Sequence, residues 1–349
     1  MEHPAVAAAR RLGEELLRPD AERVDVEGVP RSHLDALGAA GLMAVADLPL
    51  PVMREVTELL AAADASTWFV WTQHHTPVRT LRRGSNRELA ERLLAPLLAG
   101  TMLAGVAYTH LRRPGPPAVT ATPDADGWRL NGDIAWLTSW HLADVFCVGA
   151  QVVGAENEDD VVWTLLPLRD AGGVRAEPLG LAAMSGTSTF RVALDGVRVA
   201  SADVALVEAL GAWRASDAAK TADVSPAVLG VTSEAVRRLR ERGDAITDTV
   251  ADAIDEELGK LRASAYTVAD EATDGSRLEE RLALRAQAHL LAVRATTALV
   301  TVGAGRSMLL DSAAQRLARV ALFLLVQGQT AAVREATLGE LARRPFPGQ

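Results

Sequence analysis

The order of the hydrophobic patterns along the chain constrains its fold more than any other feature. Apolar residues recur at helical spacing through the first hundred residues. Between about Met102 and Ala205, short alternating or β-branched runs appear between turn residues. Helical runs return from Val207 and are longer, with few interior Gly or Pro residues. The longest are Ser225–Arg240, Asp244–Ala272, Leu278–Leu310 and Ala313–Gln327.

These patterns predict an α+β fold in three parts. Residues 1–101 are expected to form an N-terminal all-α domain, and residues 102–205 a central antiparallel β-domain, barrel-like, of seven or eight strands. Residues 206–349 are expected to form a C-terminal helical bundle, because long helices with apolar stripes suit a four-helix bundle.

Local signals predict several turns and caps. The Asn131-Gly132 pair is typical of a type I′ hairpin, and Asp195-Gly196 is expected to join two further strands. The acidic residues 154–160 are predicted to form a solvated hairpin tip. Ser66 and Ser85 are candidate helix N-caps.

Composition limits the function classes. The 349 residues are 49% hydrophobic and 23% charged, with a net charge of −9 and no long basic run. Nucleic acid and anionic membrane surfaces are therefore not expected as partners. No basic-then-apolar leader and no run near ~20 apolar residues was found, so we expect a cytoplasmic protein. Cys147 is the only cysteine, which rules out an intrachain disulfide, and we expect it to be buried.

Motifs in this order resemble the acyl-CoA dehydrogenase family of flavoproteins. The resemblance covers most of the chain, and its most specific motif is the one that begins at Asp126. The motifs are Val29–Leu34 leading to Gly38–Leu42, Asp126–Gly132 followed by Trp136–Ser139 and Ala143-Asp144, Met184–Thr189 with Asp195–Val199, and Ala314–Arg316 running to Gln327-Gly328.

The resemblance implies that FAD is the cofactor and that its flavin lies between the β-domain and the bundle. The matching flavin-binding positions are Tyr108, Thr109, Trp136 and Thr138. Threonine hydroxyls and strand N–H groups suit the polar edge of a flavin, and an indole can cover its face. Taken alone, the same residues also fit a core tryptophan with two surface threonines.

The family also supplies contacts to the FAD pyrophosphate and adenine from the bundle of a neighbouring subunit. The matching turn here contains Gly303, Gly305 and Arg306, where glycine permits close backbone approach. Close packing of two helices at these glycines is the alternative. The family's Arg-x-x-Phe-Gly element has no counterpart near Arg237–Gly243.

The base that the family uses for dehydrogenation is a carboxylate, and here Gln327 stands at or beside that position. A carboxamide has no useful basicity. Some relatives carry the base on the first bundle helix, where this chain has Lys220, with Asp217 and Asp223 nearby. We therefore considered Gln327, Asp223 and His110 as catalytic positions, although His110 is equally consistent with a plain loop residue.

Two adjacent histidines follow Trp71 in a helical segment that lines the substrate pocket in the family. His74 and His75 point about 100° apart on a helix, so they do not form a metal pair. We expect one of them near the pocket and the other exposed, and no metal site elsewhere.

Three functions remain open from the sequence. The first is an FAD-dependent oxidoreductase with non-standard chemistry: an oxidase, a monooxygenase or an atypical dehydrogenase acting on an acyl thioester or a related small molecule. The second is a non-catalytic subunit that pairs with an active homologue in a heteromer. The third is a cofactor-free descendant. The resemblance implies a homodimer or a homotetramer built through the bundle.

Overall fold

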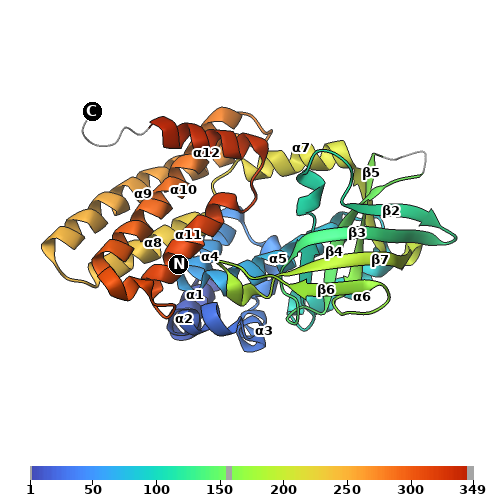
Figure 1. Ribbon diagram of the computed structural model, residues 1–349, viewed down its shortest axis with the longest axis horizontal. Coiled ribbons are helices and arrows are strands. Elements are labelled where there is room, and N and C mark those ends of the chain that lie inside the picture. Colours follow the sequence, from blue (N-terminus) through green and yellow to red (C-terminus); the bar gives the residue numbers. More distant parts are fainter. Residues whose placement is uncertain (1, 155–158, 344–349) are drawn as a thin grey trace.

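The computed structural model describes residues 2–154 and 159–343, and the order of elements is helices, then strands, then helices (Figure 1). The predicted α+β fold class is thus confirmed. The acidic run predicted as a hairpin tip falls partly on residues 155–158, which lie outside the described residues.

The N-terminal part is helical throughout. Its elements are α1 (Pro4–Leu12), the π-helical turn η1 (Gly13–Leu17), α2 (Arg18–Glu27), α3 (Arg31–Ala39), η2 (Leu42–Asp47), α4 (Leu50–Ala63), α5 (Ala65–Arg83) and α6 (Arg87–Ala99).

The predicted caps of α5 and α6 were wrong. Asp64 caps α5, with its carboxylate accepting from the backbone N–H groups of Ser66 and Thr67 at 3.0 and 3.2 Å. Asn86 caps α6 and accepts from Leu89 N at 3.0 Å. Both caps have a side-chain oxygen able to reach N–H groups two or three residues on, whereas Ser66 already lies inside α5.

One eight-stranded sheet forms the middle of the molecule, in the order β6-β7-β3-β2-β4-β5-β8, with β1 paired to β4. Most pairs are antiparallel, but β1 and β2 both run parallel to β4. The strands are β1 (Ala104–Ala107), β2 (Val119–Asp124), β3 (Gly127–Leu137), β4 (Val145–Val152), β5 (Asp160–Pro167), β6 (Val174–Pro178), β7 (Phe190–Ala200) and β8 (Val204–Ala209).

The Asn131-Gly132 hairpin prediction was wrong, because both residues lie inside the continuous strand β3. The turn between β2 and β3 falls at residues 125–126. Gly132 has a φ of +123° at a register shift, and a Cβ there would lie 2.0 Å from Ala118 O. Glycine at this position thus permits a bulge and a close backbone approach. Asp195-Gly196 likewise lies inside β7.

Long helices form the C-terminal part, in which α10 contacts α8, α9, α11 and α12. Because β8 ends at Ala209, the last strand crosses the division proposed at residue 205. The helices are α7 (Leu210–Thr221), α8 (Pro226–Arg240), α9 (Ala245–Glu271), α10 (Leu278–Gly303), η6 (Ala304–Met308), α11 (Ala313–Val326) and α12 (Ala331–Arg343).

By length and composition alone, one stretch of the described residues could cross a membrane, namely Leu278–Met308 with a mean hydropathy of 1.2. From the sequence we expected no apolar run near the length of a membrane span, so this stretch was not predicted. Most of this stretch is α10, whose apolar residues serve the packing of the bundle, since four other helices surround it.

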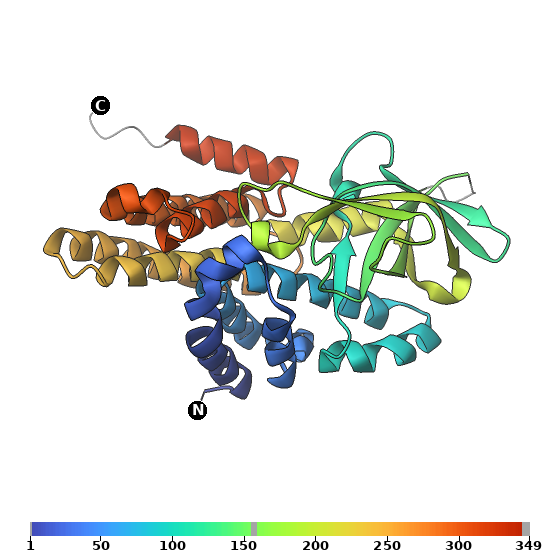
Figure 2. The ribbon, with the colours of Figure 1, turned by 60° about the horizontal axis from the view of Figure 1, so that its bottom comes forward.

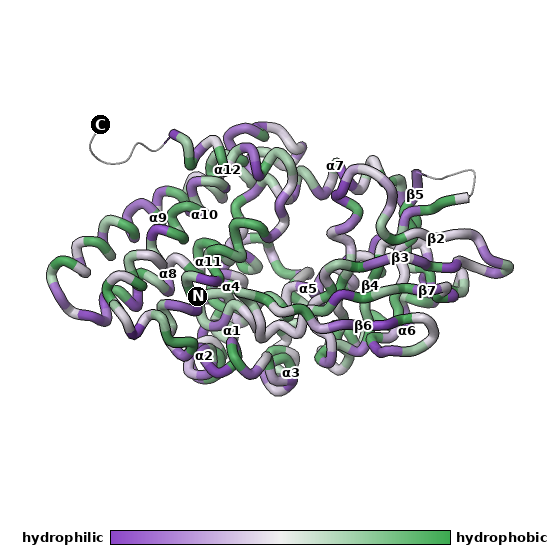
Figure 3. Tube along the Cα trace, viewed as in Figure 1, coloured by the Kyte–Doolittle hydropathy of each residue, from purple (hydrophilic) through white to green (hydrophobic). Residues whose placement is uncertain are grey.

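The two helical parts share one hydrophobic core. Val6, Leu37 and Trp71 belong to the same buried cluster as Leu291 and Leu317 of the bundle. Figure 2 shows the blue N-terminal helices on one side of the bundle and the red helix α12 on the other. Figure 3 shows long hydrophobic stretches along α8, α10 and α11.

The sheet has its own core, and a third cluster joins its β4–β5–β8 face to α5 and α6. Trp71 of α5 belongs to the helical core, whereas Val78 and Leu81 of the same helix belong to the third cluster. Helix α5 therefore connects the helical part to the sheet, and the buried Cys147 lies in the third cluster as expected.

Candidate functional site

The two segments predicted to hold a flavin edge lie side by side. β1 packs so closely on the end of β3 that a Cβ at Gly105 would lie 2.9 Å from Thr138 O. The short helix η3 (Thr109–Arg112) follows β1 and contacts β3. Thr109 is exposed, and Trp136 is 48% exposed despite its size. An exposed indole and an exposed threonine on two contacting elements offer surface that a planar ligand could cover.

Thr138, unlike Trp136, is buried, and its hydroxyl already has a hydrogen-bond partner. Its hydroxyl lies 3.0 Å from that of Thr189, which lies 2.8 Å from that of Thr187. Thr187 in turn donates to Met184 O at 2.7 Å. Side-chain hydrogen bonds within the protein therefore occupy the hydroxyl of Thr138, and it serves to join β3 to the segment before β7.

Two loops, the one after β3 and the one before β7, contain most of the non-glycine residues with positive φ in the described part of the chain. Ser139, His141, Met184 and Ser188 have positive φ values of 78°, 70°, 59° and 48°. The loops are tied together because Ser139 N donates to Thr187 O at 3.1 Å and Trp140 N to Ser188 O at 2.9 Å. Non-glycine residues in this region of φ cost energy and gather at functional sites.

Tyr108 packs into an aromatic and cationic environment. Its ring centroid lies 5.7 Å from that of Trp213 and 6.2 Å from that of Trp163. The Arg112 guanidinium lies 5.3 Å above the Tyr108 ring. Burial raises the pKa of Tyr108, so its phenol stays protonated at neutral pH.

Two arginines fasten η3 to α7. Arg112 forms a bidentate ion pair with Asp217, at 2.6 and 2.8 Å. Arg214 donates to the backbone carbonyls of Leu111 at 2.8 Å and Arg113 at 3.1 Å. These contacts hold the first helix of the C-terminal part against the segment that carries Thr109.

His110 is held inside the β-part. Its Nε2 lies 2.7 Å from Gly149 O, and burial lowers its pKa. A neutral ring that donates to this carbonyl satisfies both observations. The contact gives His110 a structural task in anchoring η3 to β4.

The expectation that one of the two adjacent histidines would be exposed was wrong. His74 and His75 are 2% and 3% exposed. His74 Nε2 lies 3.0 Å from Leu97 O, and its Nδ1 accepts from Ala104 N at 3.1 Å, so burial lowers its pKa to about 4. Both histidines are buried because α5 lies between the helical core and the sheet and packs against other elements on both of its faces.

Gln327 is the C-cap of α11, and a buried cation lies next to it. Arg285 on α10 donates through Nη2 to Gln327 O at 2.8 Å and through Nη1 to Asp223 O at 3.1 Å. Burial lowers the pKa of Arg285 to about 10, and the charge of Arg112 acts in the same direction. The position expected for a base is therefore a carboxamide beside a guanidinium.

The nearby carboxylates are already engaged. Asp223 accepts from Arg281 Nε at 2.7 Å, and Asp217 holds Arg112. Sequence reasoning missed Arg281 and Arg285, although two arginines four residues apart in an apolar helix were a visible signal.

The glycine turn proposed for FAD phosphates lies at the other end of α10. Eighteen residues separate Arg285 from Gly303, which corresponds to about 27 Å of helix. A Cβ at Gly303 would lie 2.0 Å from Ser307 Oγ, so this glycine serves a tight turn, whereas Gly305 and Arg306 are exposed. One chain therefore does not bring these residues to Gln327.

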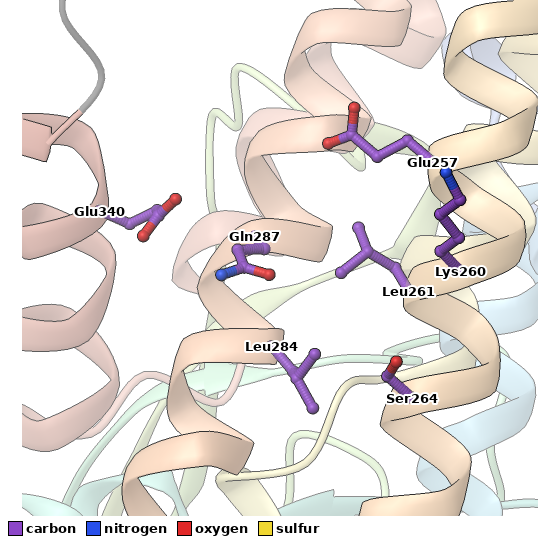
Figure 4. A pocket seen from close by; sticks show the side chains of 7 residues that line it. All are labelled: Glu257, Lys260, Leu261, Ser264, Leu284, Gln287 and Glu340. Carbon is purple, nitrogen blue, oxygen red and sulfur yellow. The ribbon is translucent and has the colours of Figure 1, made fainter.

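One hollow lies apart from these residues, and a second lies among them. The larger is an open groove between α9, α10 and α12, in which Glu257, Lys260, Gln287 and Glu340 surround Leu261 and Leu284 (Figure 4). Its charged groups are paired, as in the Lys260–Glu256 contact at 2.6 Å. The smaller is a void of about 10 Å³ beside His74 and Ser139, with room for about one water. No group of three or more metal-ligating side chains occurs among the described residues.

The sequence matches no protein-family model and no curated protein. Solved structures share the fold over nearly the whole chain. Butyryl-CoA dehydrogenase from Megasphaera elsdenii has a TM-score of 0.80 at 19% identity and covers 97% of both chains.

Two further solved structures share the fold, a dehydrogenase and a monooxygenase. A glutaryl-CoA dehydrogenase from Mycobacterium smegmatis, in complex with FADH2, has a TM-score of 0.82 at 18% identity, covering 99% of this chain and 95% of that one. Dibenzothiophene monooxygenase from Paenibacillus sp. A11-2 has a TM-score of 0.78 at 19% identity and covers 99% of both. The protein therefore has the fold of the acyl-CoA dehydrogenases.

Proposed function

We propose that the protein is an FAD-dependent oxidoreductase whose chemistry is not standard α,β-dehydrogenation by a carboxylate base. The observation that supports this most is the half-exposed Trp136 of β3, a strand that contacts the short helix η3 with the exposed Thr109. A neighbour of the same fold is in complex with FADH2. FAD would supply the hydride-accepting centre, and once reduced it can pass electrons on to dioxygen or to another acceptor.

The residues present fit the flavin ring better than the rest of FAD. Trp136 offers an indole face, and the exposed Thr109 offers hydrogen-bonding groups for a polar ring edge. The hydroxyl of Thr138 is a weaker candidate, since Thr189 already engages it. For the pyrophosphate, Arg306 of a second copy of the chain would be the cation.

The proposed departure from dehydrogenation follows from the charges around Gln327. A carboxamide cannot take up an α-proton, and the nearest carboxylates, Asp217 and Asp223, are held by arginines. The surroundings instead stabilise negative charge, because Arg285 lies within hydrogen-bond distance of the Gln327 backbone. An oxidase, a monooxygenase or an atypical dehydrogenase fits such a site, and one fold neighbour is a monooxygenase.

A non-catalytic subunit is the second candidate, favoured by the same missing carboxylate. Such a chain would pair with an active homologue and complete that homologue's cofactor site. It would be colourless alone and would bind flavin only after co-expression with the homologue.

We also propose that the protein forms a homodimer or a homotetramer. Large apolar side chains, each more than half exposed, lie on η6, α11 and α12 and the links between them. They are Met308, Leu309, Leu310, Leu322, Val326, Leu338 and Leu341.

The visible absorption spectrum of the protein purified alone, and then with added FAD, tests the main proposal. We expect a bound flavin that Trp136→Ala releases and Trp136→Phe retains, because phenylalanine keeps an aromatic face. A wild-type protein that keeps no flavin even with excess FAD would contradict a stand-alone flavoenzyme and favour the subunit role.

A further inference from the structure

Helix α2 contacts both sides of the candidate site, although none of its residues was predicted to belong to it. On one side it packs against α11, the helix that ends at Gln327. On the other it packs against η4 (Ser185–Thr187), a short helix of the segment before β7. The contacts on the two sides meet at a single residue of α2.

Two ion pairs join α2 to α11. Arg316 Nη2 donates to Glu22 Oε1 at 3.3 Å, and one turn later the Arg319 guanidinium donates to the carboxylate of Asp25. The carboxylates are three residues apart on α2 and the arginines three residues apart on α11, so the pairs lie side by side. Asp25 is 2% exposed, so removing its charge would leave Arg319 without its partner in a largely desolvated contact.

The same turn of α2 is joined to η4 through the backbone. Ser185 Oγ donates to Asp25 O at 2.7 Å, and Val29 N donates to Gly186 O at 2.9 Å. A Cβ at Gly186 would lie 2.2 Å from Val24 O, so glycine is required for this close approach. The end of α2 and η4 are therefore held at a fixed separation.

Helix η4 and the residues after it hold the loop that follows β3. Ser139 N donates to Thr187 O at 3.1 Å, and in the next pair Trp140 N donates to Ser188 O at 2.9 Å. Both Ser139 and Ser188 have positive φ, a conformation that persists only where surrounding contacts hold it. The loop begins three residues after Trp136, so contacts that hold the loop also hold the segment proposed to bind the flavin.

We propose that Asp25 is a positioning residue of the candidate site, which fixes the loop after β3 relative to α11. This inference rests on the proposed function, because it concerns how the two sides of that site are held. The carboxylate of Asp25 pairs with Arg319, which lies eight residues before Gln327. Its carbonyl oxygen accepts from Ser185 of η4. Because packed interiors transmit displacements, a shift of this one residue moves both sides of the site.

Two readouts on five proteins test the proposal. The proteins are the wild type, Asp25→Asn, Ser185→Ala, the double variant and the control Asp270→Asn, which removes the partner of the buried Arg54 between α4 and α9. Amide hydrogen exchange of residues 138–141 is measured by mass spectrometry without FAD. The dissociation constant and visible spectrum of bound FAD are measured separately. The exchange readout needs no cofactor, so a wild type that binds no FAD would contradict the proposed function and leave the positioning role to be decided by exchange.

We expect Asp25→Asn and Ser185→Ala each to speed exchange in residues 138–141, where Ser139 and Trp140 carry the reporting amides. Each should also shift the spectrum of bound FAD and weaken its binding by about threefold to thirtyfold. The double variant should be little worse than either single one, because both changes break the same connection. Asp270→Asn should leave exchange and FAD binding as in the wild type.

Three results would overturn the positioning role. The first is wild-type exchange at residues 138–141 in Asp25→Asn, and the second is an equal rise in Asp270→Asn, which would indicate a general loss of stability. The third is a fully additive effect of the two changes in the double variant. If the wild type binds FAD, an unchanged FAD affinity and spectrum in Asp25→Asn would overturn it as well.

Discussion

At the scale of single residues, the charge around Gln327 governs which reaction the site supports. Replacing Gln327 by Glu would place a carboxylate at the C-cap of α11, near the Arg285 guanidinium. The cation would keep that carboxylate ionised, so it could accept a proton from a bound thioester. We predict that Gln327→Glu protein loaded with FAD bleaches with butyryl-CoA under anaerobic conditions, whereas the wild type does not.

Gln329→Glu is the matched control, because it adds the same charge two residues further on at an exposed position. It should leave the flavin spectrum unchanged by butyryl-CoA. Bleaching of the wild type at the rate of the Gln327→Glu variant would show that another group already acts as the base.

His74 carries a second prediction at this scale. Its folded-state pKa of about 4 lies below the ordinary value of 6.5, so the unfolded chain binds a proton more readily. The stability due to neutral His74 is therefore present above pH 6.5 and is lost as the pH falls towards 4, by up to about 3 kcal/mol.

His74→Gln should remove part of this pH dependence. We expect it to cost about 1–2 kcal/mol at pH 7, through poorer packing and weaker hydrogen bonds to Leu97 and Ala104. Urea unfolding at pH 7, 6 and 5 should show a shallower decline than in the wild type. The exposed His141→Gln variant should keep the wild-type slope, and an equal slope in all three proteins would refute the assignment.

Sequence alone predicted some features of the candidate site and missed others for a physical reason. Thr109 and Trp136 lie in motifs that resemble those of the acyl-CoA dehydrogenase family, so the close approach of their two segments could be predicted. Arg285 matters through its hydrogen bonds to Asp223 and Gln327, which are distant from it in the chain. A charged residue in a helix gives no local sign of whether its partner is water, a carboxylate or nothing.

At the scale of elements, the approach of α4 to α8 depends on one glycine. A Cβ at Gly230 would lie 2.2 Å from Glu58 O, a backbone atom that cannot move without shifting α4. We predict that Gly230→Ala lowers the free energy of unfolding by about 1–3 kcal/mol, measured by urea denaturation. Gly259→Ala is the control, because nothing lies within 4 Å of its added Cβ on α9, and it should stabilise by up to about 1 kcal/mol. Equal effects from the two variants would argue against close packing at Gly230.

Element type was more predictable than element ends. The long apolar periodicities of α8, α9 and α10 were visible in sequence, because a helix of 15 or more residues repeats its signal several times. Asn131-Gly132 misled because a glycine required for a bulge and one required for a turn look alike in sequence. Only the neighbouring strand distinguishes a bulge from a turn. Here Ala118, directly before β2, places its backbone oxygen where a Cβ of residue 132 would lie.

At the scale of the whole molecule, the predicted three-part order is present, but the parts are not independent. The N-terminal helices and the bundle bury side chains such as Leu37 and Leu317 in one core. Helix α5 extends that core to the sheet. Such sharing was not predictable, because periodicity gives the buried face of a helix and not the identity of the element that covers it.

The last prediction concerns the exposed apolar side chains of α11 and α12. Leu322 and Val326 lie one turn apart on α11, each more than half exposed. If a second copy covers α11, Leu322→Glu places a charge in that interface and should shift the protein from an oligomer to a monomer in light scattering after gel filtration. Ile246→Glu adds the same charge at the start of α9 and should leave the mass unchanged. A monomeric wild type, or equal masses for both variants, would show that this face is not the interface, and FAD contacts from Arg306 of a second copy would then lose their support.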